Sequence, residues 1–281
     1  MVGGCPFVGA RGGGSRVGTG AAPQCGRMPC APTCRAVQFA SAAGREINWP
    51  SMPRARDPKD FVCTYRLEAQ ASRQGYRLIA GCDEAGRGAL LGPLYAAAVI
   101  LDPAHPISGL NDSKKLPPAE RLRLDVEIRA KAVAFRVVAI PAAEVDAVNV
   151  YEASRLAMLR ALEKLTPAPD FVLTDAMPLH RGRDEHELLI PHRALVHGDA
   201  RCASIAAASI LAKVARDAHL EELDKYYPAY RLAKNKGYGT PEHLAALARY
   251  GPCTEHRKTF EPVASYLNSL FPLPVEPFPA A

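Results

Sequence analysis

The sequence predicts an α/β fold, a five-stranded mixed sheet flanked by helices. Three predicted strands come first and are followed by strands that alternate with helices, which indicates both antiparallel and parallel pairing. Acidic residues recur at the ends of these strands, where α/β sheets build their sites. The sequence therefore predicts an architecture and, within it, a cluster of acids.

The first predicted strand leads directly into a charged turn. An apolar run at residues 76–81 indicates a strand that ends at two adjacent carboxylates, Asp83 and Glu84. A Gly-Arg-Gly turn follows, and a second apolar strand covers residues 95–101. A short helix at residues 61–74 is expected to lead into this unit.

Three helices and a third strand are expected in the middle of the chain. The helix at residues 117–131 opens on two prolines, which suit the first helical position. Valine and phenylalanine in residues 132–140 favour a strand. A short helix is expected at residues 142–148, and leucines at helical spacing predict an amphipathic helix over residues 151–165.

The last two predicted strands each precede an acid. Residues 171–174 predict strand four with Asp175 at its end, and residues 194–196 predict strand five, which Asp199 follows. A long helix is expected at residues 203–226. Its first half is rich in Ala and Ser, which allows a helix to pack closely against a sheet.

Two further segments complete the predicted domain. Residues 179–190 are polar and predict a surface turn or a short hairpin. Thr240 and Pro241 are expected to be the N-cap and the first residue of a last helix. That helix should end near Tyr250, because Gly-Pro follows as a stop signal.

The two ends of the chain differ from the predicted domain at residues 61–270. Residues 1–60 lack hydrophobic periodicity and are rich in Gly, Pro, Cys, Arg and Ala, so we expect a disordered extension. An organelle transit peptide, or a translation start at Met52, are alternatives. Residues 271–281 are expected to form a Pro-rich tail.

The composition is that of a globular protein without a membrane segment. Hydrophobic residues make up 48% and charged residues 23% of the 281 residues, and no apolar run is long enough to cross a bilayer. Five arginines and one glutamate in residues 1–50 carry most of the net charge of +6 and leave only +2 for the rest. Bulk charge therefore does not argue for nucleic acid.

The eight cysteines indicate reduced thiols in a cytoplasmic protein, because no secretory segment accompanies them. Cys25, Cys30 and Cys34 have loosely metal-like spacing, but no nearby histidine completes a zinc site.

Four acids can form a metal site if the fold brings them together. Close carboxylates repel one another, so they stay ionised only with cations among them. Mg²⁺ and Mn²⁺ take oxygen ligands, and two such ions form the clamp used for in-line phosphoryl displacement. Each acid alone also fits a turn or a helix cap. The four acids are Asp83, Glu84, Asp175 and Asp199.

Two loops suggest contacts with nucleic acid. Gly86, Arg87 and Gly88 can bring backbone groups close enough to a sugar to sense a 2′-hydroxyl, although a plain β-turn is the simpler explanation. Tyr238 lies between two glycines and can stack on a sugar or a base, or pack over its own loop. The candidate phosphate contacts, each equally consistent with an ordinary surface charge, are Lys114, Lys115, Lys213, Arg216, His256 and Arg257.

Six sequence blocks occur in order between about residues 76 and 270. They are G-C-D-E-A-G-R-G-A-L-L-G-P, N-D-S-K-K-L, L-T-D-A, G-D-A-R-C-A-S-I-A-A-A-S-I-L-A-K-V-A-R-D, N-K-G-Y-G-T-P-E-H and G-P-C-T-E-H-R-K-T-F. Together they resemble the type 2 ribonuclease H family, and bacterial ribonuclease HII in particular. Ala176 departs from the family pattern, in which glycine is frequent at that position.

The resemblance implies a ribonuclease-H-like fold with a helical C-terminal portion. It implies that a two-metal site, with Mn²⁺ or Mg²⁺, is held by Asp83, Glu84, Asp175 and Asp199. It also implies that the Gly-Arg-Gly turn reads the 2′-hydroxyl at an RNA–DNA junction, and that Tyr238 packs on the neighbouring deoxyribose.

The implied activity is that of a metal-dependent endonuclease. It would cleave the RNA strand of RNA–DNA hybrids and incise 5′ of ribonucleotides embedded in duplex DNA, leaving a 3′-hydroxyl and a 5′-phosphate. We expect a cytoplasmic monomer that serves DNA replication and repair. A non-catalytic hybrid-binding module and a type 3 ribonuclease H that prefers long hybrids are the alternatives. The four carboxylates count against the first, and the Gly-Arg-Gly block counts against the second.

Overall fold

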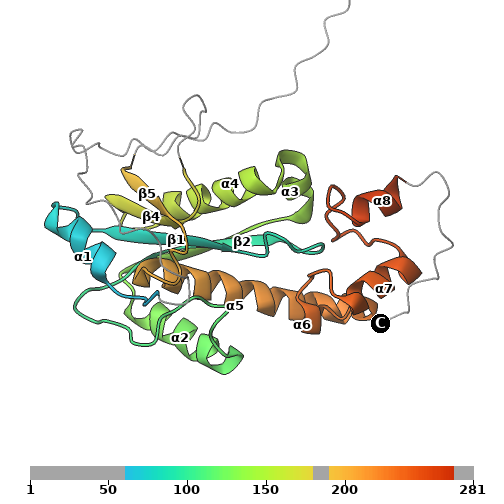
Figure 1. Cartoon of the computed structure of the whole chain (residues 1–281), viewed down its shortest axis with the longest axis horizontal. Coiled ribbons are helices and arrows are strands. Elements are labelled where there is room, and N and C mark those ends of the chain that lie inside the picture. Colours follow the sequence, from blue (N-terminus) through green and yellow to red (C-terminus); the bar gives the residue numbers. More distant parts are fainter. Residues whose placement is uncertain (1–60, 180–189, 269–281) are drawn as a thin grey trace, which may run out of the picture. The chain divides into compact units, whose positions relative to one another are not determined.

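The computed structural model describes residues 61–179 and 190–268 (Figure 1). The predictions for residues 1–60 and 271–281 lie outside the described residues. The turn or hairpin expected at residues 179–190 lies almost wholly outside them as well.

A five-stranded mixed sheet, as predicted, forms the centre of the fold. The strands are β1 (Ile79–Ala85), β2 (Leu94–Ile100), β3 (Ala134–Ile140), β4 (Phe171–Asp175) and β5 (His192–Leu195). Their order in the sheet is β3-β2-β1-β4-β5. β1 pairs antiparallel with β2 and parallel with β4, so the strand direction changes at β1.

The helices agree closely with the sequence pattern. Asn149 and Thr240 act as N-caps, because their side chains accept hydrogen bonds from the backbone in the first turn of the helix that follows. The helices are α1 (Arg66–Arg73), α2 (Pro118–Lys131), α3 (Ala142–Val148), α4 (Val150–Glu163), α5 (Ala203–Tyr226), the 3₁₀ turn η2 (Pro228–Tyr230), α6 (Leu232–Asn235), α7 (Pro241–Tyr250) and α8 (Val263–Leu267).

Helices cover both faces of the sheet, with α4 on one face and α5 and α2 on the other (Figure 1). The alternation of side chains along β2 shows this division. Ala96 and Ala98 belong to the core beneath α4, whereas Ala97 and Val99 belong to the core shared with α5 and α2. The last helices, α6 to α8, lie beyond the C-terminal half of α5 (Figure 1).

The structure differs from the sequence prediction at the end of the first strand, which matters for the site, and in the number of helices near the C-terminus. The first strand does not stop at residue 81 but continues to Ala85, because Asp83 and Glu84 pair with Ala97 and Ala96 of β2. The prediction that the helix at residues 240–250 is the last one is wrong, since α8 follows it. Both acids are therefore held on a paired strand and not in a loose turn.

None of the helices in the described part of the chain has the length and apolarity needed to cross a bilayer.

The close approach of α5 to β1 depends on Gly81. A Cβ atom at this position would lie 2.1 Å from the backbone carbon of Ser204 and 2.3 Å from the backbone nitrogen of Ile205. Backbone atoms cannot move aside without shifting the helix, so only glycine fits. The small residues at the start of α5 are buried for the same reason.

We predict that Gly81→Ala destabilises the fold by at least about 3 kcal/mol, because the added methyl group would force α5 away from the sheet. Gly88→Ala is the matched control, since a Cβ at Gly88 meets nothing within 4 Å. Thermal unfolding should show a large decrease in Tm for the first variant and almost none for the second. Equal Tm values for both variants would contradict this account of the packing.

Candidate active site

Three carboxylates lie together at the carboxyl ends of β1 and β4. Asp83, Asp175 and Asp199 each offer one ligand atom, and these atoms all lie within 4.8 Å of one another. β1 and β4 run parallel with Cys82 beside Thr174, so Asp83 and Asp175 come next on neighbouring strands. Asp199 arrives from the loop between β5 and α5. The fold thus brings together three of the four acids that the sequence singles out.

Backbone geometry holds Asp175 next to the loop that carries Asp199. The backbone N–H of Gly198 donates to Asp175 Oδ1 at 2.7 Å. A Cβ on Gly198 would lie 2.7 Å from Ile205 Cδ1, so this approach favours glycine. Ala176 has a φ of 47°, in the left-handed region that glycine adopts most easily. Glycine would therefore suit position 176 better than alanine does.

Burial and mutual repulsion disfavour the ionised forms of these carboxyl groups. Asp83 and Asp199 are 4% and 6% exposed. Burial raises the pKa of Asp83 well above its usual range, and the neighbouring carboxylates raise it further. Burial and then Asp175 raise the pKa of Asp199 to about 6. The ammonium group of Lys114 acts in the opposite direction, lowering the pKa of both Asp175 and Asp199.

Glu84 lies at the margin of the carboxylate cluster. Side chains alternate between the two faces along β1. Cys82 belongs to the core beneath α4, so Glu84, two residues later, points to that side. Ala85 belongs to the core shared with α5, so Asp83 points to the α5 side. The Glu84 carboxylate lies 3.5 Å from Arg87. Burial raises the pKa of Glu84, and Arg87 opposes this shift. Among the described residues, its buried Oε2 has no hydrogen-bond partner.

The donor set fits a hard divalent cation. All four acids supply oxygen atoms, which are the ligands that Mg²⁺ and Mn²⁺ prefer. Lys114 and Arg87 offset only part of the repulsion, because the pKa of every one of these carboxyl groups remains raised. A cation among these carboxylates would favour their ionised forms.

The Gly-Arg-Gly turn follows β1 directly. Its first glycine is packed against a buried side chain, and its second faces solvent. Gly86 has a φ of 87°, and a Cβ there would lie 1.9 Å from Nε of Arg216. Gly88 faces open space. The Arg87 side chain is 47% exposed and points both toward Glu84 and over the ring of Tyr151. The turn therefore offers an accessible backbone at Gly88 above a buried guanidinium group.

Tyr238 is partly exposed, as predicted, at 37%. It lies on a tight loop in which Lys236 and Gly237 have φ values of 52° and 76°. Cζ of Arg216 is 5.4 Å from the centroid of the Tyr238 ring. The Arg216 side chain therefore lies beneath both the Gly-Arg-Gly turn and the Tyr238 loop.

The structure corrects three of the predicted phosphate contacts. Arg216 and Arg257 are fully buried and His256 is 1% exposed, so none of them presents a charge to solvent. The guanidinium groups donate to backbone carbonyls instead, including that of Arg87, which accepts from Arg257 Nη1 at 2.9 Å. Sequence shows that a residue is basic but not that a loop folds over it. Arg216 and Arg257 instead lie beneath the Gly-Arg-Gly turn and the Tyr238 loop and support them.

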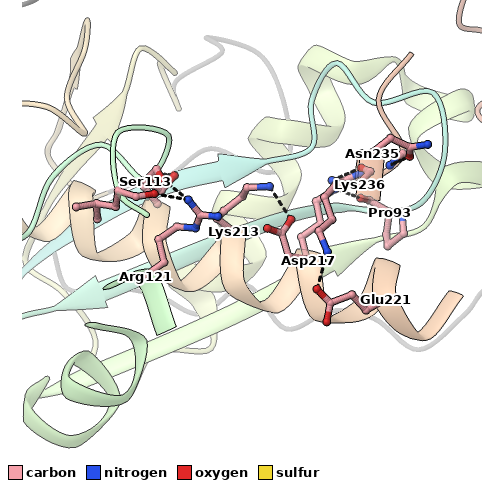
Figure 2. A network of polar contacts seen from close by, with 12 residues as sticks. Pro93, Ser113, Arg121, Lys213, Asp217, Glu221, Asn235 and Lys236 are labelled. Carbon is pink, nitrogen blue, oxygen red and sulfur yellow. Dashed lines mark hydrogen bonds and ion pairs between the residues drawn. The ribbon is translucent and has the colours of Figure 1, made fainter. Parts of the chain in front are cut away.

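The three lysines remain candidates for contact with nucleic acid. Lys114 and Lys115 are exposed. Burial lowers the pKa of Lys114, but Asp112 and then Asp83 and Asp199 raise it above its usual value, so Lys114 lies close to the carboxylates. Lys213 is paired with Asp217 at 2.6 Å, as Figure 2 shows, and its side chain is only 19% exposed. A phosphate would have to compete with Asp217 for Lys213.

Two serines behind the carboxylates were not identified from the sequence. The hydroxyl of Ser209 on α5 bonds the Asp83 carboxylate and lies 2.9 Å from the hydroxyl of Ser113. Arg121 donates to the backbone carbonyl of Ser113 at 3.0 Å and so anchors this loop (Figure 2). The only signal in the sequence is a serine within the Ala-rich face of a long helix, which small-residue packing explains equally well.

We predict that Asp199→Asn stabilises the cation-free protein. With a folded-state pKa of about 6 against the usual 3.8, the folded protein binds more protons than the unfolded chain in this window. Its stability therefore falls as the pH rises from about 4 to about 6, and the variant removes that loss. Near pH 7 in EDTA we expect a gain on the order of 2 kcal/mol, or several degrees in Tm.

Glu163→Gln is the control for this prediction, because it removes the same charge from an exposed site on α4 and should leave Tm unchanged. Mg²⁺ should raise the Tm of the unmodified protein more than that of Asp199→Asn. A loss of stability in Asp199→Asn without cation would contradict the repulsion described above.

Comparisons with known proteins agree with this geometry. The family model of ribonuclease HII matches residues 80–263. The chain is 51% identical over 213 residues to the ribonuclease HII of Solibacter usitatus (strain Ellin6076), which covers 76% of this chain and 90% of that protein. The crystal structure of the ribonuclease H2 from Pyrococcus horikoshii OT3 aligns with a TM-score of 0.56 and 26% identity, over 67% of this chain and 96% of that one. The structure of the PCNA:RNase HII complex from Archaeoglobus fulgidus aligns with a TM-score of 0.54 and 26% identity, over 66% and 96%. From its sequence, its fold and the arrangement of its carboxylates, this chain belongs to the ribonuclease HII family.

Proposed function

We propose that this ribonuclease H cleaves the RNA strand of RNA–DNA hybrids at a site made by Asp83, Asp175 and Asp199, with Glu84 as a fourth ligand. The observation that carries the proposal is the gathering of three carboxylates, two of them buried, whose ligand atoms lie within 4.8 Å of one another beside the strand that leads into the Gly-Arg-Gly turn. Acids so close together serve little purpose in a protein that only binds a polyanion. A cleavage site therefore explains them better than a binding module does.

The four carboxylates would hold two divalent cations, Mg²⁺ or Mn²⁺. When bound, such ions lower the pKa of a ligated water and stabilise charge on the leaving oxygen during in-line displacement. The chain's own residues prepare this site. Ser209 and the Gly198 N–H fix the orientation of the Asp83 and Asp175 carboxylates. Lys114 places a positive charge at the rim, where a substrate phosphate would approach.

Recognition of the ribonucleotide would fall to the turn that follows the carboxylates. The open backbone at Gly88 can approach a sugar closely and bond its 2′-hydroxyl. The exposed Tyr238 ring can pack on the adjacent deoxyribose. Both elements rest on Arg216, so their relative position is set within the protein before substrate arrives.

The position of the cut and the cellular role are further parts of the proposal. We propose incision 5′ of single ribonucleotides in duplex DNA, with a 3′-hydroxyl and a 5′-phosphate as products, in the repair and replication of DNA. We further propose that the enzyme acts as a monomer in the cytoplasm. A type 3 ribonuclease H is disfavoured, since the matching family model and the relative from Solibacter usitatus are both of ribonuclease HII.

We predict that Asp83→Asn lowers cleavage of a duplex with one ribonucleotide by more than about a hundredfold, because the variant removes a central ligand. The side chain keeps its size and its bond to Ser209, so binding of the duplex should persist. Gel analysis of the product and fluorescence anisotropy of the uncut duplex measure the two properties. Asp102→Asn, at the opposite end of the antiparallel β1–β2 pair, is the control and should cleave normally. Undiminished cleavage by Asp83→Asn would show that the site is misassigned.

We predict that Gly88→Ala lowers cleavage at the ribonucleotide about tenfold or more without changing Tm. A Cβ at Gly88 meets nothing within the protein, so any loss must come from the approach of the substrate. Gly86→Ala would be uninformative, because its Cβ would displace Arg216. Full activity of Gly88→Ala would contradict recognition of the sugar by this backbone.

A further inference from the structure

Two buried histidines lie directly behind the Tyr238 loop. His243 on α7 and His256 in the segment before α8 are 0% and 1% exposed. Their Nε2 atoms lie 3.2 Å apart. The ring of Tyr230 packs edge-on against His256, with 4.9 Å between the ring centroids. Catalysis as proposed above uses neither histidine, so their burial as a bonded pair needs another explanation.

The groups at the two ends of the pair determine which nitrogen of each ring carries a proton. Nδ1 of His243 lies 2.9 Å from the carbonyl oxygen of Tyr238, which can only accept, so this nitrogen must carry the proton. Nδ1 of His256 receives the backbone N–H of Cys253 at 3.0 Å, so it must be bare. In two neutral rings, Nε2 of His256 then donates to Nε2 of His243. The result is a continuous series of hydrogen bonds, in which the Cys253 N–H donates to His256, His256 donates to His243, and His243 donates to the Tyr238 carbonyl.

The surroundings keep both histidine rings neutral, as this series of hydrogen bonds requires. Burial lowers the pKa of His256 to about 3, with the neighbouring His243 as a second cause, and burial also lowers the pKa of His243. A proton on either ring would break the sequence of donors. It would place an N–H of His243 against the N–H of His256, or an N–H of His256 against the Cys253 amide.

This series of hydrogen bonds connects the two loops proposed to recognise the substrate. His256 forms an antiparallel bridge with Leu91, just beyond the Gly-Arg-Gly turn. The next residue, Arg257, donates to the carbonyl of Arg87 within that turn. At the other end, His243 holds the carbonyl of Tyr238, whose loop includes two residues with positive φ. Such a loop needs ties to keep one conformation.

We propose that His243 and His256 act as a neutral positioning pair, which holds the backbone at Tyr238 and so sets where the Tyr238 ring meets the substrate. The proposal rests on the contact between Tyr238 and the sugar proposed above. His243 and His256 touch no reacting atom. They act through the backbone of the Tyr238 loop.

The first test reads the tautomers directly in the full chain, without any activity. ¹⁵N-detected NMR of histidine-labelled protein near pH 7 should show His243 protonated on Nδ1 only and His256 on Nε2 only. His243→Asn and His256→Gln assign the signals. The same tautomer in both rings, or a doubly protonated ring, would overturn the proposal.

The second test uses two variants that differ in where they place a donor. In His243→Asn the amide N–H falls where Nδ1 lies and can still reach the Tyr238 carbonyl, whereas in His243→Gln it falls nearer Nε2 and cannot. Binding of a duplex with one ribonucleotide is measured by fluorescence anisotropy in EDTA, so that cleavage plays no part. We expect His243→Gln to raise Kd about tenfold and His243→Asn to raise it clearly less, because asparagine keeps the bond to the Tyr238 carbonyl but loses the bond to His256.

A double-mutant cycle separates this proposal from the function on which it rests. In a Tyr238→Ala background, His243→Gln should weaken binding no further, because the group that it positions is gone. Equal weakening in both backgrounds would overturn the role of the pair while leaving the role of Tyr238 intact. Undiminished binding by Tyr238→Ala alone would contradict the proposed contact with the sugar, and with it the basis of the pair's role.

Discussion

The contact between α5 and β1 at Gly81 determines the position of almost every group in the site. Because no side chain separates the helix from the strand, α5 runs directly along the sheet. Its N-terminus follows the loop of Asp199, Ser209 reaches Asp83, and Arg216 lies beneath the Gly-Arg-Gly turn. One helix in fixed register with one strand thus brings together the elements proposed for cleavage and for recognition.

The site combines two kinds of unfavourable burial. At the carboxyl end of β1, like charges lie close together and their pKa values rise, which disfavours the ionised forms. Farther along α5, Arg216 and Arg257 are fully buried and donate to backbone carbonyls. A bound cation would relieve the first arrangement. In the second, backbone carbonyl oxygens accept from every guanidinium nitrogen of the two arginines except the buried Nη2 of Arg257, and these bonds hold two loops in place.

The two loops proposed to recognise the substrate have backbone conformations that are costly by themselves. The Tyr238 loop has residues with positive φ, and the Gly-Arg-Gly turn needs glycine above Arg216. Buried side chains from distant parts of the chain restrain both loops, including the histidine pair and the two arginines. A preformed recognition surface loses less entropy on binding, which favours discrimination between closely similar sugars.

The sequence by itself determined the order of strands and helices, the four acids and the family, because period, caps and long motifs are local signals. It could not show that β1 continues through Asp83 and Glu84, since pairing with β2 decides that boundary. It also could not separate exposed from buried cations: Arg216, His256 and Arg257 read as surface charges until the loops folded over them. Burial and hydrogen bonding at these positions depend on segments far apart in the chain, so only the tertiary structure decided them.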